Sequence, residues 1–352
     1  MCSLSKVKRL ISLLVRLRMT ICVAALGLCA CSQSVARTIL PQAVYPVRIG
    51  VYEIFDPRAL SVLDVDADIV TLATGFEWLE GPVWSQQHDF LLFSDIPTHK
   101  VYKYQQGKGV TEYLADSGFS NGLLIRKSVD QHEQLLLMQS RSRQVAVMHA
   151  PITAPAAQYQ VLARQYNGQR LNSPNDVAMA ESGTVYFTDP PYGLPKQLDD
   201  PAKELDFQGV YALRPGGELI LLDKTLTFPN GIALHGDQKT LYVAASNPQN
   251  PAWYRYELND EGEVQSRHLF YQTSVEDNPS HGLPDGLKVH TSGLIFATGP
   301  QGIWLFDQQG KLLAKVYLPS IAANLAFNGD QSQVFVTAHN QLLSFPLKQT
   351  HN

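Results

Sequence analysis

A short phrase recurs along the sequence at intervals of about 40 to 55 residues, which is typical of repeat folds. It joins an Asn or Asp to a following run of alternating apolar residues, and it reads SPNDVAM, FPNGIAL and LPDGLKV in its clearest copies. Weaker copies read LEGPVWS, FSNGLLI and AANLAFN. The six copies place one residue at the same point of each unit: Glu80, Asn121, Asn175, Asn230, Asp285 and Asn324. The chain is therefore expected to repeat one structural motif six times.

The segments between these points predict short β-strands. Alternating stretches at 183–189, 239–246, 293–299 and 333–339 are bounded by Gly, Pro, Asp and Asn. We predict an all-β fold, a six-bladed β-propeller over residues 61–349, because radial repetition protects the sheet edges that a long open array would expose. The first strand, within 62–72, is expected to complete the last blade beside 342–347.

The N-terminus predicts export. Five basic residues and no acid are followed by an apolar run from Met19 to Cys31, which is shorter than the about 20 residues that a membrane-spanning helix needs. Residues 1–31 are interpreted as a lipoprotein-type signal peptide, because LCAC (28–31) resembles a bacterial lipobox that would place a lipid anchor on Cys31. Ser32 then indicates the outer membrane and a periplasmic location. Ordinary cleavage after Ala36 remains an alternative, and residues 32–60 are predicted to be a linker.

Cysteine usage and charge exclude two classes of protein. All four cysteines lie in the first 31 residues, so the body of the protein has no disulfide framework. Those residues also carry five bases and no acid, so their removal changes the formal net charge from −4 to −9. A surface of that sign repels phosphate backbones, and we exclude nucleic acid as a partner.

The repeat also predicts a metal site. Equivalent points of successive blades converge near the axis of a propeller, so Glu80, Asn175, Asn230 and Asp285 are expected to share one pocket. Two carboxylates and two amide oxygens form an all-oxygen set with a charge of −2. Such a set suits Ca²⁺, whereas zinc prefers His or Cys. A single Asn-Gly or Asp-Gly is more often only a turn; the shared repeat position is what favours ligands here.

Several longer motifs carry a resemblance to a known family. These are WLEGPVW (78–84), LNSPNDVAMAESGTVYFTDPPYGL (171–194), FPNGIALHGDQKTLYVAAS (228–246) and GLPDGLKVHTSGLIFATGPQGIWLF (282–306). Over roughly residues 65–345 the chain resembles the SMP-30/gluconolactonase/LRE family, in particular its bacterial gluconolactonase-like branch. The resemblance implies a six-bladed propeller with a central divalent metal, and the family's ligand motifs match Glu80, Asn175, Asn230 and Asp285.

Four other residues lie in or near these motifs. Ser173 stands where animal members of the family have Arg, which puts sugar-specific binding in doubt. His281 is a candidate acid or base, although a lone loop histidine is more often a surface residue. Asp176 is expected to be a hydrogen-bond partner at the start of a strand and not a ligand. Tyr192, in the stiff DPPYGL loop, is expected to line the rim of the pocket.

The resemblance implies metal-assisted hydrolysis of a sugar lactone such as gluconolactone. The metal would polarise the carbonyl, and Asp285, or a hydroxide on the metal, would deliver water. No GxSxG motif supports a serine esterase. Two alternatives remain open: hydrolysis of an aryl ester or a phosphotriester, and a non-catalytic propeller that the metal only stabilises. The expected partner is a small lactone or ester.

Overall fold

The structure is a computed structural model that describes residues 44–128, 130–274 and 281–349. Val44–Asn352 is one compact unit. The predicted signal peptide, Cys31 and residues 32–43 of the predicted linker lie outside the described residues. Within the described part, helical structure is limited to η1 (Pro57–Ser61) and η2 (Gln197–Asp199), and no helix is long and apolar enough to cross a membrane.

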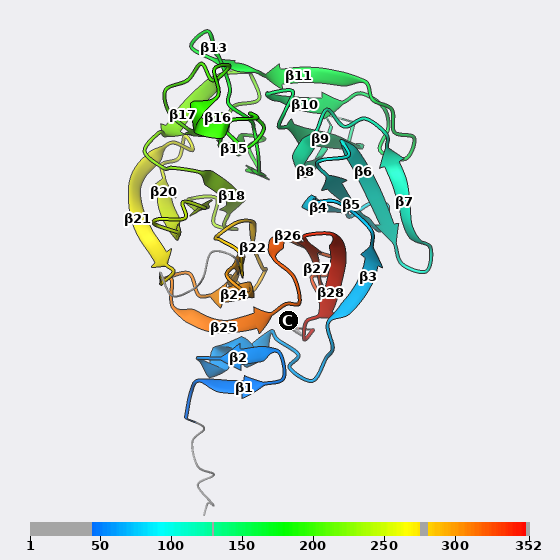
Figure 1. The fold of residues 1–352 in the computed structure, drawn as a ribbon, viewed down its shortest axis with the longest axis vertical. Coiled ribbons are helices and arrows are strands. Elements are labelled where there is room, and N and C mark those ends of the chain that lie inside the picture. The colour runs from blue at the N-terminus through cyan, green and yellow to red at the C-terminus, as the bar shows by residue number, and fades with distance from the viewer. Residues whose placement is uncertain (1–43, 129, 275–280, 350–352) are drawn as a thin grey trace, which may run out of the picture. The chain divides into compact units, whose positions relative to one another are not determined.

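Six antiparallel sheets surround one axis, and the first strand of each repeat is innermost (Figure 1). Blade 1 contains β4 (Leu79–Ser85), β5 (Phe90–Asp95), β6 (Lys100–Gln105) and β7 (Gly109–Leu114). Blade 2 contains β8 (Ser120–Lys127), β9 (Glu133–Gln139), β10 (Gln144–Met148) and β11 (Tyr159–Ala163), and a hairpin of β12 (Gln165–Tyr166) and β13 (Gln169–Arg170) follows it. Blade 3 contains β14 (Val177–Met179), β15 (Val185–Asp189), β16 (Gly209–Leu213) and β17 (Leu219–Asp223). The all-β propeller prediction is confirmed.

The remaining blades follow in chain order. Blade 4 contains β18 (Pro229–Leu234), β19 (Thr240–Ala245), β20 (Ala252–Leu258) and β21 (Val264–Gln272). Blade 5 contains β22 (Leu287–Val289), β23 (Ile295–Gly299), β24 (Gly302–Phe306) and β25 (Leu312–Tyr317). Blade 6 contains β26 (Ala322–Phe327), β27 (Gln333–Ala338), β28 (Gln341–Pro346) and, from the other end of the chain, β3 (Val70–Thr74).

Blade 6 closes the ring with both ends of the sequence. β3 pairs with β28 in antiparallel register, Thr74 opposite Gln341 and Ala73 opposite Leu342. This confirms the predicted partnership of the first and last strands, although the strand begins at Val70 and not at the start of the predicted segment. Residues before it contribute an isolated bridge between Leu63 and Leu347.

The linker prediction is wrong over residues 44–60. This segment contains β1 (Val47–Ile49) and β2 (Tyr52–Ile54), a hairpin that pairs through β2 with the outer strand β25 and extends blade 5 to six strands. Tyr52 and Ile54 are buried, so the hairpin is held by apolar packing as well as by backbone hydrogen bonds. Strands of three residues carry too little alternation to be recognised in the sequence.

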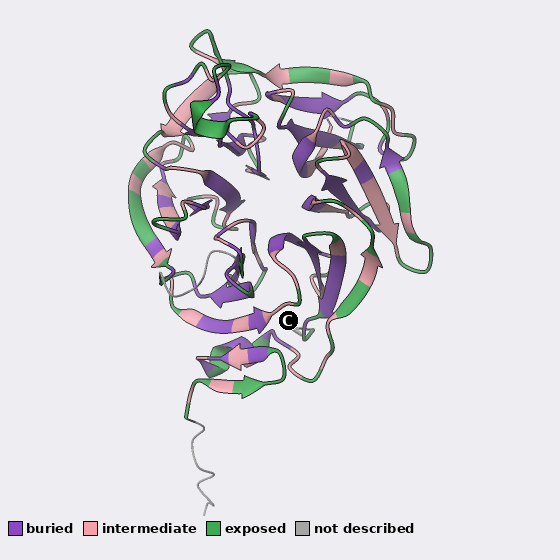
Figure 2. Cartoon of the chain, in the orientation of Figure 1, coloured by how far each residue is buried: buried purple, intermediate pink, exposed green. Residues whose placement is uncertain are grey.

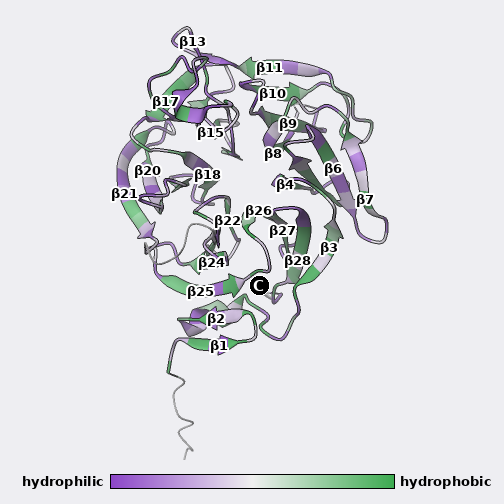
Figure 3. Cartoon of the chain, viewed as in Figure 1, coloured by the Kyte–Doolittle hydropathy of each residue, from purple (hydrophilic) through white to green (hydrophobic). Residues whose placement is uncertain are grey.

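The core lies between adjacent blades. Leu136 and Val145 of blade 2 pack in one buried cluster with Phe187 and Tyr211 of blade 3. Inner and middle strands are largely buried, whereas outer strands such as β7 and β21 have mostly exposed or half-buried residues (Figure 2). Apolar residues accordingly fill much of β10 and β28 (Figure 3). This layering brings the starts of the inner strands to the axis.

Glycine permits the close approach of the inner strands at the axis. A Cβ on Gly81, Gly122 or Gly231 would lie closer than 3.0 Å to a backbone oxygen of the next blade's repeated Asn or Asp. Gly286 is equally close to Asn324. The second residue of the repeated Asn-Gly and Asp-Gly pairs is therefore needed for packing between blades.

Hydroxyl groups of second strands tie three inner strands to the next: blade 1 to blade 2, blade 3 to blade 4, and blade 5 to blade 6. Ser94 Oγ donates to the carbonyl oxygen of Asn121 at 2.9 Å, and Thr188 Oγ1 donates to that of Asn230 at 2.6 Å. Thr298 Oγ1 does the same for Ala323 at 2.9 Å. These bonds are buried and fix the repeated residues of neighbouring blades relative to one another.

The glycine contacts predict that an added methyl group destabilises the protein at the axis but not at an uncrowded glycine. Gly231→Ala should lower the melting temperature by several degrees, because overpacking of this kind costs about 1–3 kcal/mol. Gly236→Ala is the matched control, since a Cβ there meets nothing within 4 Å. Thermal unfolding followed by circular dichroism checks this, and equal melting temperatures for the two variants would contradict it.

Candidate functional site

The starts of the inner strands surround a cavity of about 350 Å³ on the axis. All four predicted ligands line it: Glu80 on β4, Asn175 just before β14, Asn230 on β18 and Asp285 just before β22. They come from blades 1, 3, 4 and 5. The convergence expected from the repeat position is thus what the fold produces.

Backbone irregularity aims these side chains inward. The ladder shifts register at the repeated residue in β4, between Glu80 and Val83, and in β18, between Pro229 and Ile232. Such bulges re-aim a side chain that a regular strand would point along its sheet. Glu80 is buried, and its Oε2 accepts a hydrogen bond of 2.9 Å from Gly81 N.

The two amides form a chain across blades 3 and 4. Asn175 Nδ2 donates to Asn230 Oδ1 at 2.8 Å, and Asn230 Nδ2 donates to Ser246 Oγ at 2.8 Å. Ser246 Oγ in turn donates to the carbonyl oxygen of Pro284 at 2.5 Å, beside Asp285. The amide side chains are therefore held before any ligand binds.

The two carboxyl groups are held in an environment that opposes their charge. Burial, followed by the negative charge of Asp176, raises the pKa of Glu80 from 4.5 to about 7. Removal from water and the nearby Glu80 and Asp176 raise the pKa of Asp285 well above its ordinary value. A bound cation would reverse both effects.

Asn121 is a lining residue that the predicted ligand set did not include. It occupies the repeated position of blade 2 and lines the cavity, and its Oδ1 is buried with no hydrogen-bond partner. A buried, unpaired oxygen costs free energy unless something binds it. The repeat itself was the signal, since FSNGLLI aligns Asn121 with Asn175 and Asn230.

The other residues weighed in the sequence take distinct places. Tyr192 lines the cavity as predicted, and its ring stacks on Phe228 with centroids 5.6 Å apart. Burial raises its pKa, so the hydroxyl stays protonated at neutral pH. Ser173 is used internally: its Oγ donates to Pro190 O at 2.5 Å and accepts from Gly193 N at 2.9 Å, which shapes the DPPYGL loop.

His281 and Asp176 lie away from the cavity wall. His281 is exposed and lines a neighbouring cavity with His339. Asp176 is buried and accepts hydrogen bonds from Val177 N at 2.9 Å and Ile232 N at 3.3 Å. Asp176 is thus the hydrogen-bond partner at a strand start that the sequence predicts.

These donors fit an oxygen-seeking divalent cation. Two carboxylates, two amides and the unpaired oxygen of Asn121 face one small space, and a cation would relieve both the repulsion and the missing hydrogen bond. Within the described residues, no three or more His, Cys, Asp or Glu side chains gather in a group that could hold a metal ion by themselves. Any metal here would therefore depend on amide as well as carboxylate oxygens.

Comparison with known families agrees with this geometry. Residues 78–340 match the family described as SMP-30/Gluconolactonase/LRE-like region. The chain belongs to this family. The SMP-30/gluconolactonase match spans all six repeated positions, from Glu80 to Asn324.

Individual members of the family show how close the likeness is. A gluconolactonase of Zymomonas mobilis is 36% identical over 283 residues, 76% of this chain and 77% of its own. A chicken (Gallus gallus) regucalcin is 23% identical and covers 74% of this chain, with 82% of its own length matched. The solved structure of a gluconolactonase from Xanthomonas campestris superimposes with a TM-score of 0.73 at 31% identity, covering 84% of this chain and 94% of that one.

The raised pKa of Glu80 predicts how the metal-free protein responds to pH. Glu80 ionises near pH 4.5 when unfolded but near 7 when folded, so its contribution to stability is present at low pH and is lost as pH rises through that window. In excess chelator the melting temperature should fall between pH 5 and pH 8. Glu80→Gln should make this decrease in melting temperature smaller. Part of the decrease should remain, because the pKa values of Asp285 and Asp189 are also raised. The exposed Glu181→Gln is the control, and the idea fails if both variants follow the wild-type curve.

Proposed function

We propose that this protein hydrolyses lactones in the central cavity, with a sugar lactone such as gluconolactone as the leading substrate. The observation that carries the proposal is the convergence of Glu80 and Asp285 with three amide side chains from five blades on one cavity. Two of the relatives described above are gluconolactonases, and a cavity of about 350 Å³ falls within the size range of small-molecule sites.

We further propose that the site works with a divalent cation, Ca²⁺ in the first place, held by Glu80, Asn175, Asn230 and Asp285. When bound, the cation would act as a Lewis acid on the lactone carbonyl. The regucalcin relatives include an Agrobacterium tumefaciens protein described as calcium-binding, which at 17% identity supports the shared fold alone. The choice of Ca²⁺ rests on the oxygen-only donor set.

Asp285 is the proposed general base. Its ionised carboxylate accepts a proton from the water that attacks the carbonyl carbon; the ring C–O bond then breaks, and the proton passes to the ring oxygen to give the hydroxy acid. A cation that offsets the raised pKa of Asp285 would keep its carboxylate ionised and able to accept the proton. The stacked Tyr192 and the hydrogen-bonded Asn175 and Asn230 keep the walls of the cavity fixed around the substrate.

A second substrate class is favoured by the cavity walls. Trp78, Ile96, Leu283 and Ile321 supply apolar surface, and Ser173 is already committed to its own loop. An ester or lactone with an aryl or alkyl group would bury that group there. These classes are distinguished by measuring turnover of gluconolactone, an alkyl-substituted lactone, phenyl acetate and a phosphotriester. If the folded protein turned over none of them, a non-catalytic, metal-stabilised propeller would be favoured.

Metal removal should abolish hydrolysis of glucono-1,5-lactone, and added Ca²⁺ should restore it. The assay is proton release at constant pH by the stripped and the reloaded protein. Chelation should also lower the melting temperature, because a ligand that binds only the folded state stabilises it by about 2.7 kcal/mol at 100-fold excess over Kd. Full activity in excess chelator, with no residual metal by elemental analysis, would end the metal proposal.

Two variants separate the base from a simple ligand. Asn230→Ala removes a neutral ligand, so saturating Ca²⁺ should restore much of its kcat. Asp285→Asn keeps an oxygen of the same reach but cannot accept a proton, so its kcat should stay about 10²- to 10⁴-fold down at any Ca²⁺ concentration. Equal rescue of both variants would reduce Asp285 to a ligand. The base would then have to be sought in a hydroxide on the metal, since His281 lies outside the cavity wall.

We also propose a periplasmic location with a lipid anchor on Cys31. The support is the lipobox-like LCAC and the basic, apolar segment before it. Cys31→Ser should move the mature protein from the membrane fraction to the soluble fraction, with kcat unchanged because the catalytic cavity lies in the propeller. Cell fractionation tests this, and an unchanged membrane fraction would reject the anchor.

A further inference from the structure

Blade 3 has a charged residue at the position where most blades have glycine near the axis. Blades 1, 2, 4 and 5 have glycine after the repeated residue, whereas blade 6 has the apolar Leu325 and blade 3 has Asp176. Its carboxylate is buried below the layer of predicted ligands, on the side of Val177 and Ile232. The axis thus has a second layer that contains a third carboxylate.

The second layer also holds an ammonium group. Lys288 Nζ donates to Asn324 Oδ1 and to the carbonyl oxygen of Leu287, each at 3.1 Å, and pairs with Asp176 Oδ2 at 3.6 Å. Asn324 Nδ2 donates to the same carboxylate oxygen at 3.3 Å. A carboxylate, an amide oxygen and a carbonyl oxygen are the ligand types that hard metal cations prefer.

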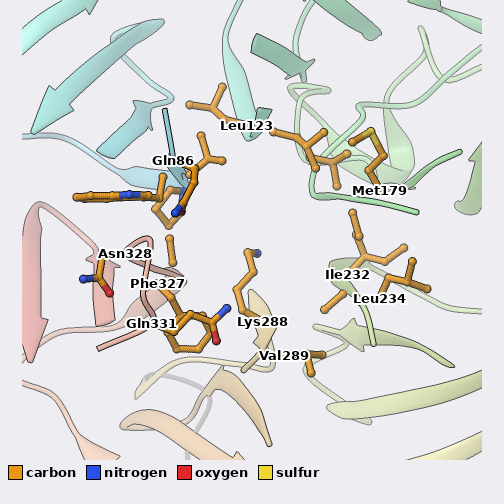
Figure 4. Close-up of a pocket in the computed structure, with 18 of the residues that line it drawn as sticks. Gln86, Leu123, Met179, Ile232, Leu234, Lys288, Val289, Phe327, Asn328 and Gln331 are labelled. Carbon is orange, nitrogen blue, oxygen red and sulfur yellow. The ribbon is translucent and has the colours of Figure 1, made fainter. Parts of the chain in front are cut away.

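The stem of Lys288 reaches this position from the opposite end of the axis. It passes through a second cavity, of about 400 Å³, whose apolar wall includes Leu123, Met179, Ile232 and Phe327 (Figure 4). The side chain is 26% exposed and lines that cavity, and its ammonium contacts oxygens of Leu287, Asn324 and Asp176. Lys288 thus brings a positive charge to the axis.

Charge balance gives the ammonium a role. Glu80, Asp285 and Asp176 bring three negative charges to the two layers when ionised, and Lys288 brings one positive charge. The remainder of −2 matches a single divalent cation. Without Lys288 the remainder would be −3, and one divalent cation would leave a buried charge unbalanced.

We propose that Lys288 is the protein's own axial cation, whose ammonium occupies a second cation position and limits the propeller to one divalent metal ion. The inference rests on the proposed function, in which a metal ion binds in the layer of predicted ligands. It predicts that removal of the lysine side chain opens an oxygen-lined position next to Asp176 and Asn324 that a second Ca²⁺ enters.

The test is the number of Ca²⁺ ions bound per chain, measured by equilibrium dialysis of the chelator-stripped full-length protein. Wild type should bind one and Lys288→Ala two, and the double variant with Asp176→Asn should return to one. In chelator, Lys288→Ala should melt below wild type, and Ca²⁺ should raise its melting temperature by more than it raises that of wild type. Lys108→Ala, which removes an exposed hairpin lysine, should match wild type throughout.

The outcomes separate this inference from the proposed function. If wild type and Lys288→Ala each bind one Ca²⁺ with the same affinity, the axial-cation role is overturned and the proposed metal stands. If wild type binds none, the proposed metal fails, and a single Ca²⁺ gained by Lys288→Ala would still support the second position, whereas none would overturn it. If Lys288→Ala does not fold, Lys288→Gln takes its place, and a folded Gln variant with the wild-type stoichiometry overturns the role.

Discussion

The structure depends on how closely six inner strands approach one another at the axis. Gly81, Gly122, Gly231 and Gly286 leave no room for a side chain at their contacts with the next blade, and buried hydroxyls such as Thr188 fasten the same points. Because these contacts fix the backbone of the repeated residues, the side chains of Glu80 and Asp285 are placed by the ring and not by flexible loops. The geometry of the site is therefore a property of the closed ring.

That closeness has an electrostatic cost. Buried carboxyl groups from different blades face one another, and burial and mutual repulsion raise the pKa values of Glu80 and Asp285. In the metal-free protein these effects favour the protonated form of both carboxyl groups, whereas a cation would favour the ionised form. The same repulsion that disfavours their negative charge thus favours the binding of a positive charge in the cavity.

The repeat made most of the fold and the centre of the site predictable. Because one residue recurs at the same point of each unit, the convergence of Asn175, Asn230 and Asp285 could be inferred without coordinates. The hairpin β1–β2 could not, since it pairs with the outside of blade 5 and belongs to no repeat. Lys288 was equally hidden, because its alternating position in LKV says nothing of an ammonium bound to Asp176 across the axis.

The closure of blade 6 sets an order on how the chain can acquire its structure. β3 lies near the beginning of the propeller sequence, but its partner β28 is the last strand, so the early strand has no sheet to join until Gln341–Pro346 exist. Blades 1 to 5 can form locally as they are synthesised, whereas the ring, and with it the axial cavity, is completed only at the end. A chain that ended before β28 would thus lack both the strand that β3 pairs with and the closed ring around the axial cavity.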